Sequence, residues 1–275
     1  MMVSAQALLR RMLVLGMLGA SLAVAGLMAG CAQTPSIPSE RAPPSSPEAA
    51  DAERRALVRL ELAGAYFANG QIETAIEEAR LALETYPNLS AAHSLRGLAY
   101  AALGDDSLAE ASFRRALQID PNDGGTLHNL AWFHCQRGRF GPAQENFAAA
   151  LALPHYRDRA RTFMARGVCY ARDSRWPEAE AALMRSYELD PANVGAGFSL
   201  AEVLYRRQEF ERARFYINRV NDTKGATNAQ TLWLAVRIEH HLGRDSMVRV
   251  IGEQLRMRFP QSPEATLFDR GRFDD

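Results

Sequence analysis

Small and large apolar residues recur along the chain at fixed places, with a period of about 34 residues. In units that begin at residues 56, 90, 124, 160 and 194, the eighth residue is alanine or glycine and the twentieth is alanine. Large side chains, among them Phe113, Phe147 and Leu183, stand four residues after that alanine. Small residues let two helices approach closely, and large ones fill the space between turns. The pattern therefore predicts units of two closely packed antiparallel helices.

Glycine and proline mark where these helices are expected to end. Gly70, Gly104 and Gly138 are one period apart and stand where a first helix would finish in a left-handed turn, which glycine adopts at little cost. The second helices stop before a proline, because that position disfavours helix: Pro87, Pro121, Pro191 and Pro260. These boundaries give six units, roughly 56–89, 90–123, 124–159, 160–193, 194–228 and 229–262.

Two kinds of departure interrupt the period. The interval from Pro121 to Pro191 exceeds twice the period by two positions, so we expect a small insertion at residues 153–158 of the third unit. Gln208 replaces the turn glycine in the fifth unit, and Val248 replaces the alanine in the sixth. Terminal units are expected to be atypical, since one of their faces has no neighbour to pack on.

A period of this length with these small and large positions is the signature of the tetratricopeptide repeat, a helix pair that stacks on copies of itself. We therefore predict an all-α fold, a right-handed superhelical solenoid of about six repeats over residues 51–265. Residues 266–275 would form a C-terminal tail.

The first thirty residues have the pattern of an export signal. Arg10 and Arg11 precede an uncharged stretch, Met12–Ala29, and small residues stand immediately before Cys31. The alternative is an uncleaved membrane anchor, because about 18 apolar or small residues almost suffice to span a bilayer. We favour cleavage, since it explains the position of Cys31.

Met28-Ala29-Gly30-Cys31 resembles the lipobox of bacterial lipoprotein signals. That resemblance implies acylation of Cys31 and, because the next residue is Ala32 and not aspartate, delivery to the periplasmic face of the outer membrane of a Gram-negative bacterium. Residues 32–50 contain five prolines and four serines and lack helical periodicity, so we expect 31–50 to be a lipid-anchored, flexible tether.

The charge balance gives no indication of a nucleic-acid partner. The chain has 32 basic and 32 acidic residues, and loss of residues 1–30 would leave a net charge of about −2.

No set of residues suggests catalysis, a metal site, a cofactor or a small-molecule substrate. His240 and His241 are adjacent, so they point to different sides of a helix, and no carboxylate at a spacing of three or four completes a site with both. Phosphate loops, nucleophile elbows and paired-cysteine zinc patterns are absent from the sequence. We expect a protein that is not an enzyme.

Cys135 and Cys169 are one period apart, at nearly equivalent places of consecutive units. Two small, partly buried residues are the simpler interpretation. An exported protein also meets an oxidising compartment, so the sequence leaves a disulfide open.

In repeats of this kind, the second, fifth, ninth and twelfth residues of each first helix point into a concave groove. Large apolar and aromatic groups there would favour a hydrophobic or amphipathic partner segment, although superhelical curvature could bury individual members. Charged clamps for a peptide carboxylate place lysine and asparagine at the fifth and ninth positions, which this chain lacks in its first three units. The candidate groove residues are Leu60, Phe67, Leu98, His128, Trp132, Met164, Val168, Phe198, Tyr205 and Trp233.

Three phrases resemble the type IV pilus biogenesis and stability lipoproteins, the pilotin group of PilF and PilW: LGDDSLAEASFRRALQIDPND, LPHYRDRARTFMARGVCY and LAEVLYRRQEFERARFYINR. The second phrase, at the insertion, is not dictated by the generic repeat. The resemblance implies an outer-membrane lipoprotein that binds the pilus secretin subunit and promotes its localisation and multimerisation, and hence twitching motility. We expect Leu60, Phe67 and Leu98, with Trp132 beside them, to form the contact.

Two other functions are compatible with these patterns. One is an outer-membrane adaptor that docks periplasmic cell-wall enzymes. The other is an enzyme that uses the groove as a substrate channel, which the lack of a converging acid, base, nucleophile or metal set disfavours.

Overall fold

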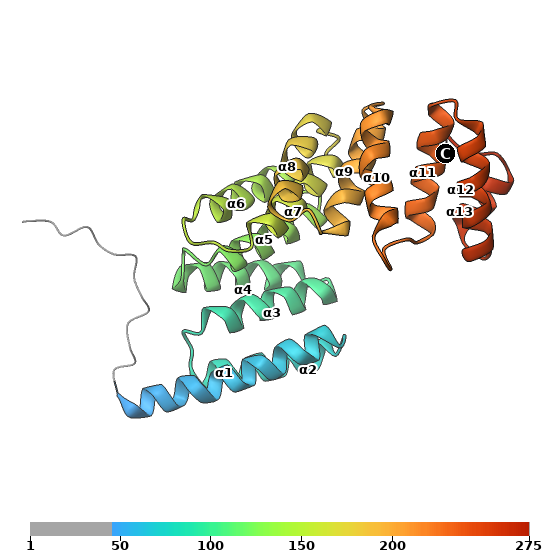
Figure 1. The fold of residues 1–275 in the computed structure, drawn as a ribbon. Helices are drawn as coiled ribbons and strands as arrows, with labels where there is room; N and C mark the ends of the chain where they lie inside the picture. The colour runs from blue at the N-terminus through green and yellow to red at the C-terminus, as the bar shows by residue number, and fades with distance from the viewer. Residues whose placement is uncertain (1–45, 275) are drawn as a thin grey trace, which may run out of the picture. The chain divides into compact units, whose positions relative to one another are not determined.

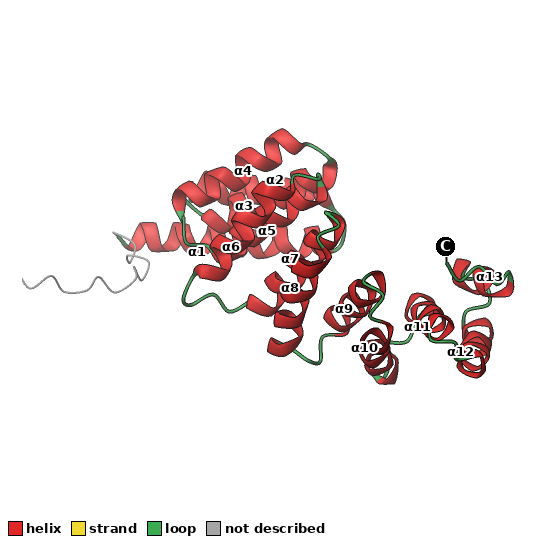
Figure 2. Cartoon of the chain, turned by 90° about the horizontal axis from the view of Figure 1, so that it is seen from above, coloured by secondary structure: helices red, strands yellow, loops and turns green. Residues whose placement is uncertain are grey.

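The computed structural model describes residues 46–274. The predicted leader (1–30), Cys31 and the predicted tether up to residue 45 lie outside the described residues. Within the described part, all regular structure is helical (Figure 2). The helices are α1 Pro47–Ala68, α2 Ile72–Thr85, α3 Ser90–Leu103, α4 Asp106–Ile119, α5 Gly124–Gln136, α6 Phe140–Ala152, α7 Arg159–Arg172, α8 Trp176–Leu189, α9 Val194–Arg206, α10 Phe210–Asp222, α11 Ala229–His241, α12 Asp245–Arg258 and α13 Pro263–Asp269.

The first twelve helices form six consecutive pairs, α1–α2 to α11–α12, stacked in chain order (Figure 1). The first helix of each pair also contacts the first helix of the next, whereas the second helices do not contact one another within residues 46–274. The first helices therefore line the inner side of the stack. This arrangement confirms the all-α solenoid of six repeats.

All six pairs turn through a left-handed residue between their two helices, whether or not that residue is glycine. Gly70, Gly104 and Gly138 have φ of 75°, 81° and 72°, as their spacing predicts. Ser174 and Gln208 take the same conformation, with φ of 56° and 61°, although such residues adopt it at a cost of about 1–2 kcal/mol. Packing of the flanking helices holds this turn even where the sequence does not favour it.

The small residues at the eighth position act as predicted. A Cβ added to Gly97 would lie 2.8 Å from the ring of Phe113, and one added to Gly167 would lie 2.6 Å from Leu183. Phe113 and Leu183 are fully buried, so neither can move aside cheaply. Glycine is therefore required where these second-helix side chains press against the first helix.

The predicted insertion forms the loop 153–158 between α6 and α7. The ring of Tyr156 in this loop packs directly against Gly124. A Cβ added to Gly124 would lie only 2.4 Å from that ring. Its hydroxyl lies 2.6 Å from Oγ1 of Thr162, in the first turn of α7. The insertion thus ties the third repeat to the fourth.

Both ends of the folded part differ from the predicted boundaries. Helix α1 begins at Pro47, within the stretch predicted as tether, because Ser46 accepts a capping hydrogen bond from the amide of Ala49 and proline fits the first helical position. At the other end, the first four residues of the predicted tail belong to α13, which packs on α11 and α12. The last helix pair would otherwise expose an apolar face.

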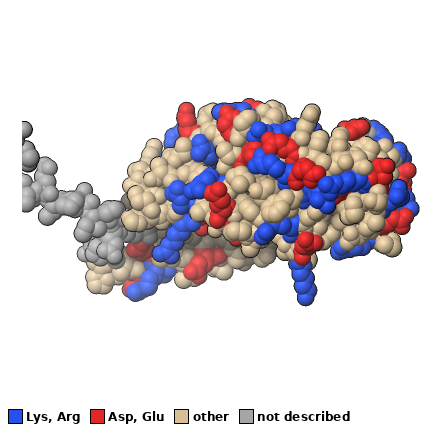
Figure 3. Space-filling model, turned by 45° about the horizontal axis from the view of Figure 1, so that its top comes forward, with Lys and Arg blue, Asp and Glu red and all other residues tan. Residues whose placement is uncertain are grey.

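Arginines near the end of a first helix pair with acids on the second helix of the preceding repeat. Arg137 donates to Asp106 at 2.8 Å, Arg139 to Glu110 at 2.7 Å and Arg244 to Glu211 at 2.8 Å. Exposed pairs of this kind contribute less than about 1 kcal/mol each. Acidic and basic side chains interleave on the face shown in Figure 3.

None of the described helices is both long and apolar enough to serve as a membrane span.

Candidate protein-binding surface

We define the concave face as the solvent side of α1, α3, α5, α7, α9 and α11. Seven of the ten predicted groove residues are half-buried on it, and three are buried. The groove is thus less open than a row of fully exposed apolar side chains. The half-buried members are Leu60, Phe67, Leu98, Trp132, Met164, Val168 and Phe198; the buried ones are His128, Tyr205 and Trp233.

The N-terminal part of the concave face offers apolar surface from α1 and α3. Leu60 is half-buried against the core around Leu89, and Leu98 against the core around Phe113. Phe67, near the end of α1, is half-buried and belongs to none of the core clusters of the described residues. A partner could therefore cover Phe67 without displacing packed side chains.

Helix α1 also exposes apolar side chains at the third and seventh places of the first repeat, which the groove positions do not include. Val58 is 58% exposed and Leu62 is 43% exposed, one turn apart, and Leu57, at the second place and hence a groove position, lies beside them. Among the described residues, no repeat precedes α1 to cover this side. The signal in the sequence is the position of the repeat, since the third places of the later repeats are buried.

His128 is structural rather than free to bind. Its Nδ1 lies 2.8 Å from Thr162 Oγ1, the same oxygen that Tyr156 contacts. Burial lowers the pKa of His128 to about 4, with Arg161 adding to the effect. Burial likewise raises the pKa of Tyr156. The imidazole is therefore neutral at pH 7 and links α5, α7 and the insertion loop.

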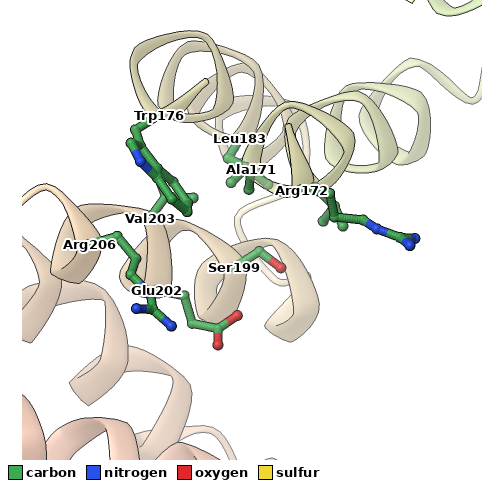
Figure 4. Close-up of a pocket in the computed structure, with 9 residues that line it drawn as sticks. Ala171, Arg172, Trp176, Leu183, Ser199, Glu202, Val203 and Arg206 are labelled. Carbon is green, nitrogen blue, oxygen red and sulfur yellow. The ribbon is translucent and has the colours of Figure 1, made fainter. Parts of the chain in front are cut away.

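A cavity of about 270 Å³ opens between α7, α8 and α9. Its wall is mostly apolar and includes the predicted groove residue Val168, the indole of Trp176 and Val203 (Figure 4). Glu202 and Arg206 stand along α9 at its edge. Such a cavity has room for one large apolar side chain of a partner.

The charged groups at this edge are not bound to one another. Arg206 makes no hydrogen bond or ion pair with any residue between 46 and 274. The side chain of Glu202 reaches solvent, yet surrounding protein atoms partly desolvate its carboxylate and raise the pKa, against the opposing effect of Arg206 and Arg237. Both groups can pair with a partner.

The C-terminal part of the concave face is covered by the chain itself. The hydroxyl of Tyr205 lies 2.9 Å from Nε2 of His241, and Trp233 packs beside Phe273 at 6.0 Å between ring centroids. A second cavity of about 380 Å³ lies here; it is lined by Tyr205, Arg206, Gln208, Phe210, Arg237, His241 and Asp274. Within residues 46–274, no three His, Cys, Asp or Glu side chains gather as a metal site would require.

Cys135 of α5 and Cys169 of α7 form a disulfide, which resolves the choice that the sequence left open. Their Cα atoms are 5.8 Å apart, and both residues are fully buried. Half-buried Trp132 packs against the same cluster. The bond links the first helices of repeats three and four directly beneath the concave face.

Comparisons with known proteins agree with this architecture. Tetratricopeptide-repeat models match residues 90–123 and 129–194. The type IV pilus assembly protein PilF of Pseudomonas aeruginosa is 26% identical over 214 residues, which cover 78% of this chain and 84% of PilF. The crystal structure of PilW, a widely conserved type IV pilus biogenesis factor, superposes with a TM-score of 0.71 at 27% identity and covers 77% of this chain and 96% of PilW. A solved structure of PilF has the same fold, with a TM-score of 0.71 at 24% identity over 80% of this chain and 99% of PilF.

The chain is therefore similar, over most of its length, to type IV pilus biogenesis proteins built of tetratricopeptide repeats. Both relatives are matched over most of their length, so the similarity is not confined to one or two generic repeats. The family resemblance expected from the three sequence phrases is thereby confirmed.

In this chain, the predicted groove positions identified the right helices but did not show how exposed each side chain is. Position alone does not show that the insertion loop buries His128 or that the C-terminal segment covers Trp233. Arg237, at the ninth place of α11, also lines the concave face, but its charge lies outside the apolar pattern from which the groove residues were predicted.

Proposed function

We propose that the protein is an outer-membrane lipoprotein that binds the subunit of the type IV pilus secretin and promotes its localisation and assembly. The observation that carries the proposal is the similarity to PilF, which spans 78% of this chain and 84% of that pilus assembly protein. The role is that of a binding protein and not of an enzyme.

The concave face supplies the surface for such a partner. Phe67 offers an aromatic ring outside the core, and Leu60 and Leu98 extend the apolar surface along α1 and α3. An exposed apolar segment of an unassembled secretin subunit would be covered there until subunits join. Acyl chains on Cys31 would hold the repeats at the same membrane and raise the effective concentration of the pair.

Leu60→Asp combined with Phe67→Asp is expected to weaken secretin binding at least a hundredfold. Each change places a charge where an apolar contact is expected, and central interface contacts are worth about 2 kcal/mol or more apiece. The measurement is the amount of secretin that copurifies with the protein from detergent-solubilised outer membranes.

Leu108→Asp combined with Phe215→Asp is the matched control. It makes the same two exchanges at side chains that are 44% and 55% exposed on second helices, away from the concave face. Secretin recovery should stay unchanged in the control. Equal recovery with both pairs, in variants whose circular dichroism shows a folded chain, would exclude the N-terminal contact.

Cys31→Ala is expected to release the protein from the outer membrane into the soluble periplasmic fraction, because the acylation site is removed. Secretin rings should then form less efficiently at the outer membrane. The measurements are immunoblots of separated membranes and of heat-resistant secretin multimers. Retention of the variant in the outer membrane would contradict lipid anchoring.

A further inference from the structure

The last described residues of the chain return to the concave face of the sixth repeat. Trp233, Arg237 and His240 occupy the fifth, ninth and twelfth places of α11, where the repeat directs side chains into the groove. Each of them contacts Phe273, which lies beyond the end of α13. The tail therefore lies where a bound peptide would lie in another repeat.

Phe273 is held by both its side chain and its backbone. Its ring centroid lies 4.5 Å from that of His240 and 6.0 Å from that of Trp233. Its carbonyl accepts a hydrogen bond of 2.9 Å from Nε of Arg237. An apolar side chain on an aromatic surface, with a main-chain hydrogen bond beside it, is a common way to hold an extended peptide.

Positive charge continues past this aromatic contact. Oδ1 of Asp274 lies 3.4 Å from Nε2 of His241, at the edge of the cavity of about 380 Å³. Arg237 uses only its Nε for the Phe273 carbonyl, and the guanidinium of Arg206 has no hydrogen-bond or ion-pair partner in the described part of the chain. Guanidinium donors therefore remain available next to Asp274, and they suit carboxylates.

Residues 273–274 lie beyond α13 and belong to no helix. The ring of Phe268 in α13 would be 1.9 Å from a Cβ at Gly252, so it fills a space between helices. Phe273 is half-buried like Phe268 and packs against the same core cluster, but it lies beyond the end of α13, and the side chain of Asp274 is 78% exposed. Residues 273–274 can thus leave the groove while the helix pair stays packed.

We propose that the concave face of repeats five and six binds partner segments in which an aromatic residue is followed by acidic residues, and that Phe273–Asp274 occupies this site until such a segment replaces it. The site differs from the N-terminal contact on α1 and α3. The site would recognise the aromatic and acidic side chains of the segment, whichever protein carries that segment.

The test measures binding of a fluorescein-labelled peptide with the sequence of residues 271–275, GRFDD, by fluorescence anisotropy. The full chain with Phe273→Ala and Asp274→Ala should bind the peptide at least tenfold tighter than the unchanged chain, because its own tail no longer competes. In the peptide, alanine for phenylalanine should cost at least tenfold, and asparagine for the first aspartate about threefold. Equal binding to both chains, or to neither, overturns the proposal.

Two further variants locate the site. Arg237→Gln, added to the tail variant, should weaken peptide binding at least tenfold. Arg249→Gln removes the same charge from an exposed position of α12 and should leave binding unchanged. Equal effects of the two would show a nonspecific charge attraction and overturn the assignment.

Backbone NMR of the unchanged chain gives a readout that needs no tail substitution. Saturating peptide should move the resonances of Phe273 and Asp274 to those of an unstructured chain, while the amides of α11 and α12 stay protected from exchange. Unchanged tail resonances under saturation would show that the peptide binds elsewhere and would overturn the proposal.

Discussion

Reduction of the Cys135–Cys169 disulfide is expected to lower the free energy of unfolding by about 4 kcal/mol. The bond joins residues 34 apart in sequence, and a closed loop of that length restricts the unfolded chain by about this amount in the loop-entropy model. Both cysteines are fully buried, so reductant reaches the bond only when repeats three and four open. The measurement is urea unfolding, followed by circular dichroism, with and without a phosphine reductant.

The experiment is best made in a chain with Cys31→Ala, which leaves only the bonded pair among the three cysteines. A second chain with Cys135→Ala and Cys169→Ala as well should match the reduced protein and give no response to reductant. Identical unfolding curves before and after reduction of the bonded chain would contradict a stabilising disulfide.

Acidification from pH 6.5 to pH 4 is expected to remove about 3 kcal/mol of stability through His128 alone. Burial lowers the pKa of His128 to about 4, whereas an unfolded histidine titrates near 6.5, and each unit of difference is worth about 1.4 kcal/mol. The unfolded chain therefore takes up the proton first. The contribution is complete above pH 6.5, falls as the pH drops towards 4, and falls no further below the folded pKa.

His128→Gln should flatten this part of the pH dependence while leaving the effects of other histidines in place. The matched control is His155→Gln, which changes an exposed histidine of the insertion loop and should keep the fall. Urea midpoints measured at half-unit intervals of pH give both curves. An unchanged slope in His128→Gln would show that His128 is not the buried titrating group.

The repeat architecture was predictable because it depends on local rules that recur. Gly97 and Gly167 must be small, since the ring of Phe113 and the side chain of Leu183 press against them. The turn at Gln208 shows the limit of this reasoning: the residue type does not favour a left-handed turn, but the two helices it joins impose it. The insertion at 153–158 was also predictable, since it shifts the period.

The burial of individual side chains on the concave face was harder to predict, because it depends on contacts outside the repeat pattern. His128 is buried through Tyr156 of the insertion, and Trp233 through Phe273 of the tail. Both covering residues lie in irregular segments, for which the period says nothing. The disulfide likewise needed the distance between α5 and α7, which the separation in sequence does not provide.

Each first helix packs against both helices of the repeat before it, so small rotations at these junctions would let the inner face widen or narrow around a partner. The Cys135–Cys169 bond removes this freedom between repeats three and four. Bending would then be confined to the other junctions. Repeats one to three and repeats four to six would each flex, while the junction between repeats three and four stays rigid.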